Sequence, residues 1–132
     1  ESEVLAAALA AAEAAERREE VVAVQELIDG ATTPHVALGL ESALGALAEG
    51  RVHRLFVAAD LARDGAQCET CDRLTADLGL CPAGGGATRP IADLREQAVE
   101  LALAQGARVE IVAGLASVLL MRHGGLGART RY

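Results

Sequence analysis

The stretch GLESALGALAEGRVHRLFVAAD, residues 39–60, decides the fold, because it joins a short helix to a buried strand. Residues 39–50 repeat apolar side chains at helical spacing and end at Gly50, a common helix stop. The apolar run 52–59, bounded by Asp60, has the length and composition of a buried strand. The residues that share the helical face are Leu40, Leu44, Leu47 and Ala48.

Similar elements alternate on both sides of this unit. A short strand-like run, 35–38, precedes it, and a helix from Pro90 to Gly106 follows at a distance. The remaining predicted elements are a strand at 108–113, a helix at 115–122 and a strand at 126–132. Alternation of this kind predicts a layered α/β sheet with largely parallel neighbours.

The chain begins with a stretch that favours one long helix over 3–29. It contains no Gly or Pro, Ser2 is placed to cap it and Gly30 to stop it. We interpret its charged middle, Glu16 to Glu20, as a solvated face. The apolar stripe before that middle is a candidate surface for pairing with a second copy of the chain. Because the sequence starts inside a helical pattern, we expect it to be a piece of a longer protein. The two apolar stripes are Val4, Leu5, Ala8, Leu9 and Ala12, then Val21, Val24, Leu27 and Ile28.

Composition limits the class of protein. The 132 residues, enough for one domain, include 29 Ala and 19 Leu but one Phe and no Trp, so small aliphatic side chains must fill the core. A hydrophobic fraction of 52% excludes intrinsic disorder, and uncharged stretches such as 4–12 and 111–121 are too short to span a bilayer, so no membrane association is expected. We expect a single domain, 1–132, with a leading helix at 3–29, an α/β core at 35–62 and 90–132, and an insert at 63–89.

The charge disfavours direct nucleic-acid binding. All twelve basic residues are Arg, and nineteen acids leave a net charge of -7. The first 50 residues hold ten acids and two Arg, whereas the rest of the chain is close to neutral. Only the tail 122–132 offers a local basic patch.

The insert 63–89 holds all three cysteines and is predicted to lack a core of its own, because only Leu74, Leu78 and Leu80 could pack. Cys68 and Cys71 form a Cys-x-x-Cys pair, and Cys81-Pro resembles the start of a second pair. Four thiolates at such spacing make a structural zinc ribbon, but the fourth position here is Gly84. The metal ligands would be Cys68, Cys71 and Cys81, with a His, a carboxylate such as Asp72, or water in the fourth position.

Other chemistry finds little support in the sequence. Acidic Glu69 and Asp72 beside the Cys-x-x-Cys pair argue against a thioredoxin-like redox site. An odd cysteine count favours a reducing cytoplasm over secretion. His35, His53 and His123 lack a nucleophile partner, so no catalytic or cofactor-binding residue is predicted and the chain is not expected to be an enzyme.

Taken together, residues 39–60, the cysteine insert, 93–102, 105–112 and the closing GGLGARTRY of 124–132 resemble a known family. It is the third, C-terminal domain of class I peptide chain release factors of the archaeal and eukaryotic type, and especially of the bacterial proteins related to them. The resemblance implies an α/β/α sandwich with a mixed, largely parallel sheet, similar to the kink-turn-binding ribosomal protein superfamily. Relatives often carry two Cys pairs in the insert, and this chain departs from that pattern at Gly84.

The resemblance implies a docking role. In the family, peptidyl-tRNA hydrolysis depends on a Gly-Gly-Gln loop in another domain, whereas this domain contacts a translational GTPase or the recycling ATPase. We therefore expect a non-catalytic interaction domain of a ribosome-associated, cytoplasmic translation protein. The alternatives are binding of kink-turn or ribosomal RNA, although Gly39-Leu-Glu-Ser replaces the Gly-x-Asn-Glu of kink-turn binders, and, more remotely, a zinc or thiol enzyme.

Overall fold

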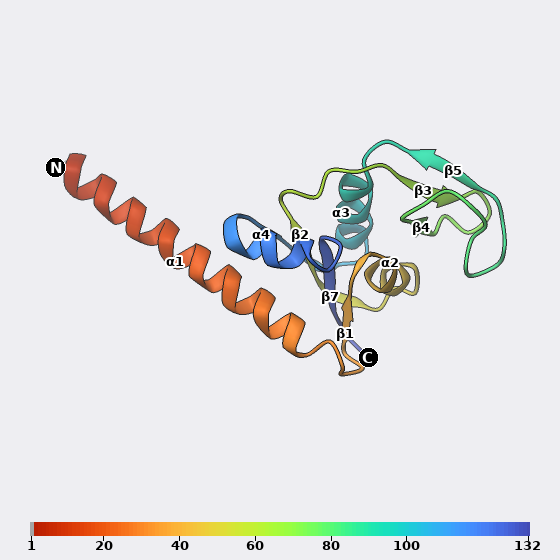
Figure 1. Cartoon of the computed structure of the whole chain (residues 1–132), viewed down its shortest axis with the longest axis horizontal. Helices are drawn as coiled ribbons and strands as arrows, with labels where there is room; N and C mark the ends of the chain where they lie inside the picture. The colour runs from red at the N-terminus through yellow and green to blue at the C-terminus, as the bar shows by residue number, and fades with distance from the viewer. Residues whose placement is uncertain (1) are drawn as a thin grey trace.

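The computed structural model describes residues 2–132, and Glu1 lies outside the described residues. Helix α1, Ser2–Asp29, is a straight rod whose outer half extends away from the body of the molecule (Figure 1). Its inner half packs on the body, where Val24 and Leu27 are fully buried. The predicted helix is therefore confirmed. The first apolar stripe is exposed (Leu9 by 56%), and its pairing with a second copy stays a prediction.

The main sheet has four strands in the order β1-β7-β2-β6. Strand β2 pairs in parallel with β6, whereas β7 lies antiparallel between β1 and β2. The mixed sheet is confirmed, but the expectation of largely parallel neighbours overstates its parallel part. The closing strand returns between the two earlier ones after the Gly124-Gly125 turn, and so reverses direction. The strand bounds are Val36–Leu38 for β1, Val52–Ala58 for β2, Arg108–Val112 for β6 and Leu126–Thr130 for β7.

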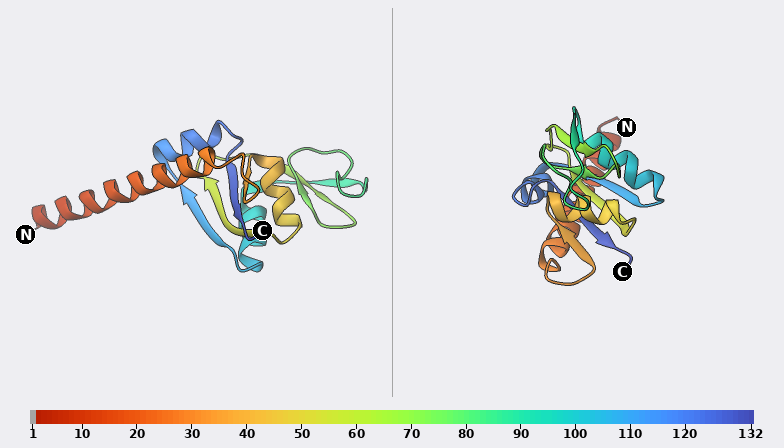
Figure 2. Two further views of the ribbon diagram at one scale, coloured as in Figure 1. Left: turned by 90° about the horizontal axis from the view of Figure 1, so that it is seen from below. Right: turned by 90° about the vertical axis from the view of Figure 1, so that its right-hand side faces the viewer.

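Helices cover both faces of this sheet (Figure 2). Helices α2, Leu40–Ala48, and α3, Leu94–Ala104, pack on one face. The inner half of α1 and helix α4, Gly114–Met121, pack on the other. The predicted α/β/α sandwich is confirmed. Strand β2 lies at its centre, and its Leu55, Phe56 and Val57 are inaccessible to solvent.

Helix α1 approaches the sheet very closely at Gly127 of β7. A Cβ atom added at Gly127 would lie only 2.5 Å from Cδ2 of Leu27, so any side chain there would force Leu27 out of its place. The preceding turn also requires glycine, because Gly125 has φ +90 and an added Cβ would lie 3.0 Å from Leu61. The closing glycines of the chain therefore serve the packing of Leu27 and the turn from α4 into β7.

The insert forms a second, smaller sheet at the end of the molecule opposite the N-terminus (Figure 1). Its strands are β3, Gly65–Cys68, β4, Leu74–Thr75, and β5, Thr88–Ile91, all antiparallel in the order β4-β3-β5. Of the three leucines expected to pack, Leu74 is buried, but Leu78 and Leu80 are exposed by 62% and 74%.

The predicted start of a helix at Pro90 is wrong. Pro90 lies in β5, opposite Ala66, and β5 is an edge strand, where a missing backbone N–H is tolerated. Helix α3 begins later, because the Asp93 carboxylate caps it by accepting a hydrogen bond of 3.0 Å from the N–H of Glu96.

We predict that Leu27→Ala destabilises the fold by about 2–5 kcal/mol, because it removes a fully buried side chain over Gly127 and leaves a cavity. Leu9→Ala is the matched control on the same helix, and its exposed side chain predicts a change within about 0.5 kcal/mol. Urea denaturation followed by circular dichroism measures both. Equal effects of the two substitutions would show that α1 does not hold the body together at this point.

Candidate metal centre in the insert

Two turns of the insert have the same backbone hydrogen-bond pattern. In the first, the N–H of Cys68 donates to the carbonyl of Arg73 and the N–H of Asp72 donates to the carbonyl of Cys68. In the second, the N–H of Cys81 donates to the carbonyl of Gly86 and the N–H of Gly85 donates back to Cys81. The residues that donate back, Asp72 and Gly85, both have positive φ, 63 and 72.

In this equivalence, Cys68 of the first turn corresponds to Cys81 of the second, and Cys71 corresponds to Gly84. Each turn therefore presents a cysteine at its first position, and the first turn presents another at its fourth. The fourth position of the second turn is Gly84, where an added Cβ would meet no atom within 4 Å. The fold keeps both halves of a two-turn cysteine centre, with space for a side chain at the position that glycine occupies.

The turns bring the three sulfur atoms together. The Sγ atoms of Cys68, Cys71 and Cys81 all lie within 4.8 Å of one another, and those of Cys71 and Cys81 are 3.6 Å apart. Cys68 and Cys81 are buried, Cys71 is exposed, and none of the three forms a disulfide. Sequence spacing alone predicted this cluster. Asp72, the carboxylate considered for the fourth position, does not join the sulfur group among the described residues.

Hydrogen bonds favour the thiolate form of one of the three cysteines, Cys68. The Thr70 hydroxyl, 3.2 Å from Sγ of Cys68, together with the backbone N–H groups of Cys71 and Thr70, lowers the pKa of the Cys68 thiol to about 6. At Cys71 the backbone N–H of Arg73 acts in the same direction, but the neighbouring sulfurs of Cys68 and Cys81 outweigh it and raise the pKa of the thiol. Sequence reasoning missed Thr70, whose role depends on the shape of the turn.

Three clustered sulfurs are suited to a soft or borderline metal ion. Thiolates bind zinc at about 2.3 Å, and a tetrahedral site with three protein ligands leaves one position for water or another group. Three of the four donors fit such a site, and the exposed Cys71 side is open to solvent. The buried position of two sulfurs, one at the end of β3, ties the cluster to the small sheet. The arrangement can bind a metal and brace the insert.

The insert is anchored to the body mainly through helix α2. The guanidinium of Arg73 lies over α2, where a Cβ added at Gly45 would be 3.1 Å from its Nη2 atom. The backbone N–H of Ala76 donates to the Glu41 carboxylate at 3.4 Å. The three histidines, His35, His53 and His123, are all exposed, as expected for surface imidazoles, and none lies in the sulfur cluster.

Comparisons with solved structures identify the fold. The chain is similar to the C-terminal domain of a peptide chain release factor from Methanosarcina mazei, with 24% identity over 99% of this chain and 92% of that chain and a TM-score of 0.66. It is also similar to archaeal Pelota in a structure of ribosome-bound Pelota and ABCE1 (19% identity, TM-score 0.58). An archaeal translation termination factor matches with 22% identity and a TM-score of 0.51. The fold is that of the release-factor C-terminal domain.

The extent of these matches differs. The match to Pelota covers 88% of this chain but only 26% of the Pelota chain. The match to the termination factor covers 87% of this chain and 26% of that factor. Neither a protein-family model nor a curated protein sequence matches it. No helix among residues 2–132 is long and apolar enough to cross a membrane.

We predict that Gly84→Cys tightens zinc binding by about tenfold or more, because a fourth thiolate would complete the tetrahedron from the equivalent position of the second turn. Competition against a chromogenic chelator measures the affinity. Gly84→Ser is the matched control, since it adds a side chain of similar size without a sulfur, and it should leave the affinity within about twofold of the unsubstituted chain. Unchanged affinity in Gly84→Cys would contradict the equivalence of the two turns.

Proposed function

We propose that this chain is the non-catalytic interaction domain of a ribosome-associated, release-factor-like translation protein. The observation that carries the proposal is the fold match, which runs over nearly all of this chain and nearly all of a release-factor C-terminal domain. The sequence resemblance in 39–60 and 124–132 supports the same assignment. Catalysis in the parent protein, where it occurs, would belong to another domain.

The proposed partner is a translational GTPase or a recycling factor. Support comes from the Pelota neighbour, whose structure is described as ribosome-bound together with ABCE1. A protein-docking role needs only a stable fold that presents a binding surface.

Helix α4 offers such a surface. Its Leu115, Val118 and Met121 recur at every third residue and are exposed by 60%, 47% and 38%. Val22 of α1, which packs beside α4, is exposed by 56%. Aliphatic side chains grouped on one face are typical of an interface core once a partner covers them. We place the docking face on the α1 and α4 side of the sandwich.

The cysteine centre has a structural role in this proposal. A zinc ion held by Cys68, Cys71 and Cys81 would fix the two turns of the insert and compensate for its few buried apolar side chains. The arrangement of the sulfurs and the shape of the two turns support such an ion. The insert then acts as a rigid projection of the domain at the end opposite α1.

We predict that the double substitution Leu115→Ser and Val118→Ser weakens binding to the cognate purified translational GTPase or recycling ATPase by about tenfold or more, because it removes the apolar centre of the face. Isothermal titration calorimetry measures the affinity. Leu103→Ser on α3, exposed by 59% on the opposite layer, is the matched control and should bind normally.

Two further results would overturn the proposal. Binding of neither purified partner by the unsubstituted chain would remove the docking role. Sub-micromolar binding of kink-turn or ribosomal RNA at moderate salt, in an electrophoretic shift, would favour the RNA-binding alternative, which the net charge of -7 opposes.

A further inference from the structure

Strand β6 has a strand neighbour on one side only. In the order β1-β7-β2-β6 it is an edge of the main sheet, and its partner is β2. The carbonyl of Val112 points toward the β2 side, since it accepts a hydrogen bond of 2.8 Å from the N–H of Ala59. Because backbone groups alternate along a strand, Val109 and Ile111 direct their N–H and C=O groups outward. These groups are a template for one more strand.

The open edge is flanked by a cleft on each face of the sheet. One cleft, of about 530 Å³, lies between β6 and the middle of α1, and Glu16 and Glu19 contribute to its lining. The other, of about 350 Å³, lies between β6 and the start of α3, with Glu96 and Glu100 in its lining. Ile111 lines both clefts and is exposed by 55%. An added strand would therefore find room for its side chains on both faces.

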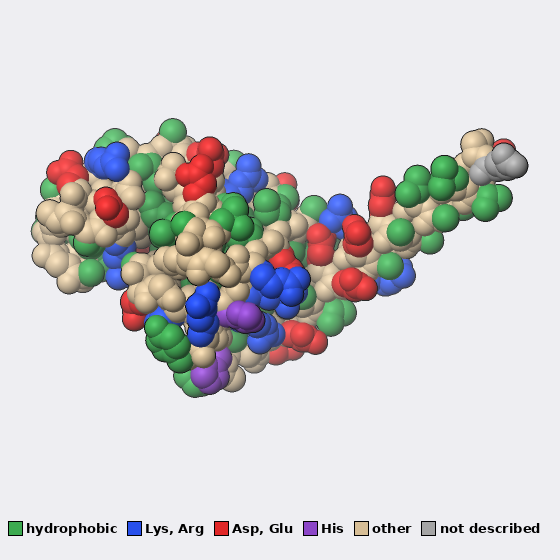
Figure 3. Space-filling model, turned by 180° about the vertical axis from the view of Figure 1, so that it is seen from behind, with side chains coloured by type: hydrophobic (Ala, Val, Ile, Leu, Met, Phe, Trp, Pro, Cys, Tyr) green, Lys and Arg blue, Asp and Glu red, His purple; other side chains and the backbone are tan. Residues whose placement is uncertain are grey.

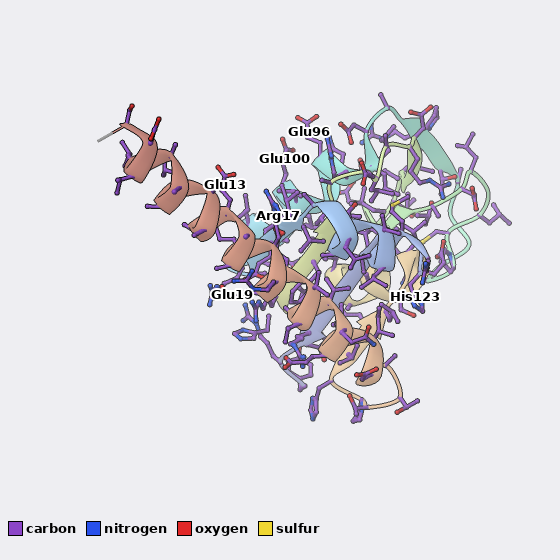
Figure 4. The ribbon with its side chains drawn as sticks, turned by 60° about the vertical axis from the view of Figure 1, so that its left-hand side comes forward. Glu13, Arg17, Glu19, Glu96, Glu100 and His123 are labelled. Atoms are coloured by element: carbon purple, nitrogen blue, oxygen red, sulfur yellow. The ribbon has the colours of Figure 1, made fainter. Side chains whose placement is uncertain are left out.

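Acidic side chains outnumber basic ones in both flanks, and Arg95, the arginine of the second cleft, donates to the carbonyl of Ala59. Figure 4 shows Glu19 projecting from α1 and Glu96 and Glu100 projecting from α3. Within residues 2–132, the carboxylates of Glu16, Glu19, Glu96 and Glu100 form no ion pair. The cations of the first cleft are already engaged, because Arg54 donates to Glu110 at 2.6 Å and Arg108 lies 3.8 Å from the same carboxylate. Figure 3 shows acidic side chains, with arginines between them, along the middle of α1, where the helix meets the body.

We propose that the open edge of β6 binds an extended, basic peptide segment of a partner protein by strand addition. The outward backbone groups of Val109 and Ile111 pair with the peptide, and Ile111 provides the apolar contact. Lysine or arginine side chains of the peptide then lie beside the unpaired carboxylates of α1 and α3. This inference concerns the β6 edge, which shares helix α1 but not α4 with the proposed docking face, and it does not rest on the release-factor-like role.

A second copy of this chain is a poorer occupant of the same edge. Antiparallel pairing of two β6 strands centred on residue 110 would place the two Glu110 carboxylates opposite each other. It would also bring the acidic middle of one α1 toward that of the other copy. Because Arg54 already pairs with each Glu110, the acidic middle of α1 is the main effect that opposes self-association and favours a cationic partner.

The probe for the test is a capped hexapeptide, Lys-Lys-Val-Val-Lys-Lys, titrated into the isotope-labelled chain at low ionic strength. Its paired lysines point to both faces of the added strand. We expect backbone amide shifts centred on Val109 and Ile111 in the NMR spectrum, and cross-strand proton contacts between the peptide and β6. A peptide with N-methylated backbone on its pairing edge should bind at least about tenfold more weakly, because it cannot donate to the strand. The same peptide with glutamate in place of lysine should not bind measurably.

Variants of the chain separate backbone pairing from side-chain contact. Ile111→Pro removes an outward N–H, which an edge strand tolerates, and should reduce peptide affinity at least about tenfold. Its matched control, Ile111→Ala, keeps the N–H and should lose clearly less. The quadruple variant Glu16→Gln, Glu19→Gln, Glu96→Gln and Glu100→Gln should reduce affinity about tenfold or more and flatten its salt dependence. Circular dichroism of each variant establishes that the fold is retained.

Three results would overturn the proposal. The first is a binding site mapped by NMR to residues other than β6 and its flanks. The second is unchanged affinity of the N-methylated peptide, which would exclude strand addition even where Ile111→Pro unfolds the chain. The third is a dimer of the unsubstituted chain in analytical ultracentrifugation that Ile111→Pro converts to a monomer, because it would assign the edge to a second copy. None of these results bears on binding of a GTPase through α4.

Discussion

The contact of Leu27 with the bare backbone of Gly127 determines how the layers of this protein come together. A core with 29 Ala and 19 Leu, one Phe and no Trp in the whole chain has no large side chains to fill wide gaps, so the helices must lie close to the sheet. Leu27 achieves that closeness at β7, and the glycine turn before β7 makes room for it. This contact, together with the packing of α1 on α4, holds the inner half of α1 on the body.

The cysteine centre is held together by different interactions from those of the core. Its two turns are held by paired backbone hydrogen bonds, and the sulfurs gather because the turns are alike, with few apolar side chains packed around them. Such a unit gains stability from whatever binds the sulfurs, while contacts from Arg73 and Glu41 join it to α2. The insert and the sandwich are therefore joined by these polar contacts and by a small apolar contact, in which Leu74 of the insert is part of the main core.

Periodicity predicted most of the sandwich, because helices and buried strands have distinct spacings of apolar residues. It could not assign strand direction, because a buried strand has the same pattern of apolar residues whether its neighbour runs parallel or antiparallel. Strand β7 is the example, since it runs antiparallel to β2. Pro90 was misplaced because proline suits both a first helical turn and an edge strand. In the cysteine cluster, spacing was enough to predict that Cys68, Cys71 and Cys81 lie together and that Gly84 takes the place of a fourth cysteine. The effect of Thr70 on the pKa of Cys68 depends on the shape of the folded turn, so the sequence alone does not predict it.

Part of the chain's negative charge lies beside the open edge of β6, where it affects which strands can pair with that edge. An open strand edge invites pairing with any other edge, and proteins commonly protect such edges with charge. Here Glu110 sits at the centre of β6, held by Arg54, and unpaired carboxylates of α1 and α3 stand on both sides. Charge of one sign repels a second copy of the same chain but attracts a basic segment. In our proposal, the charge that opposes self-association at this edge also selects a partner of opposite charge.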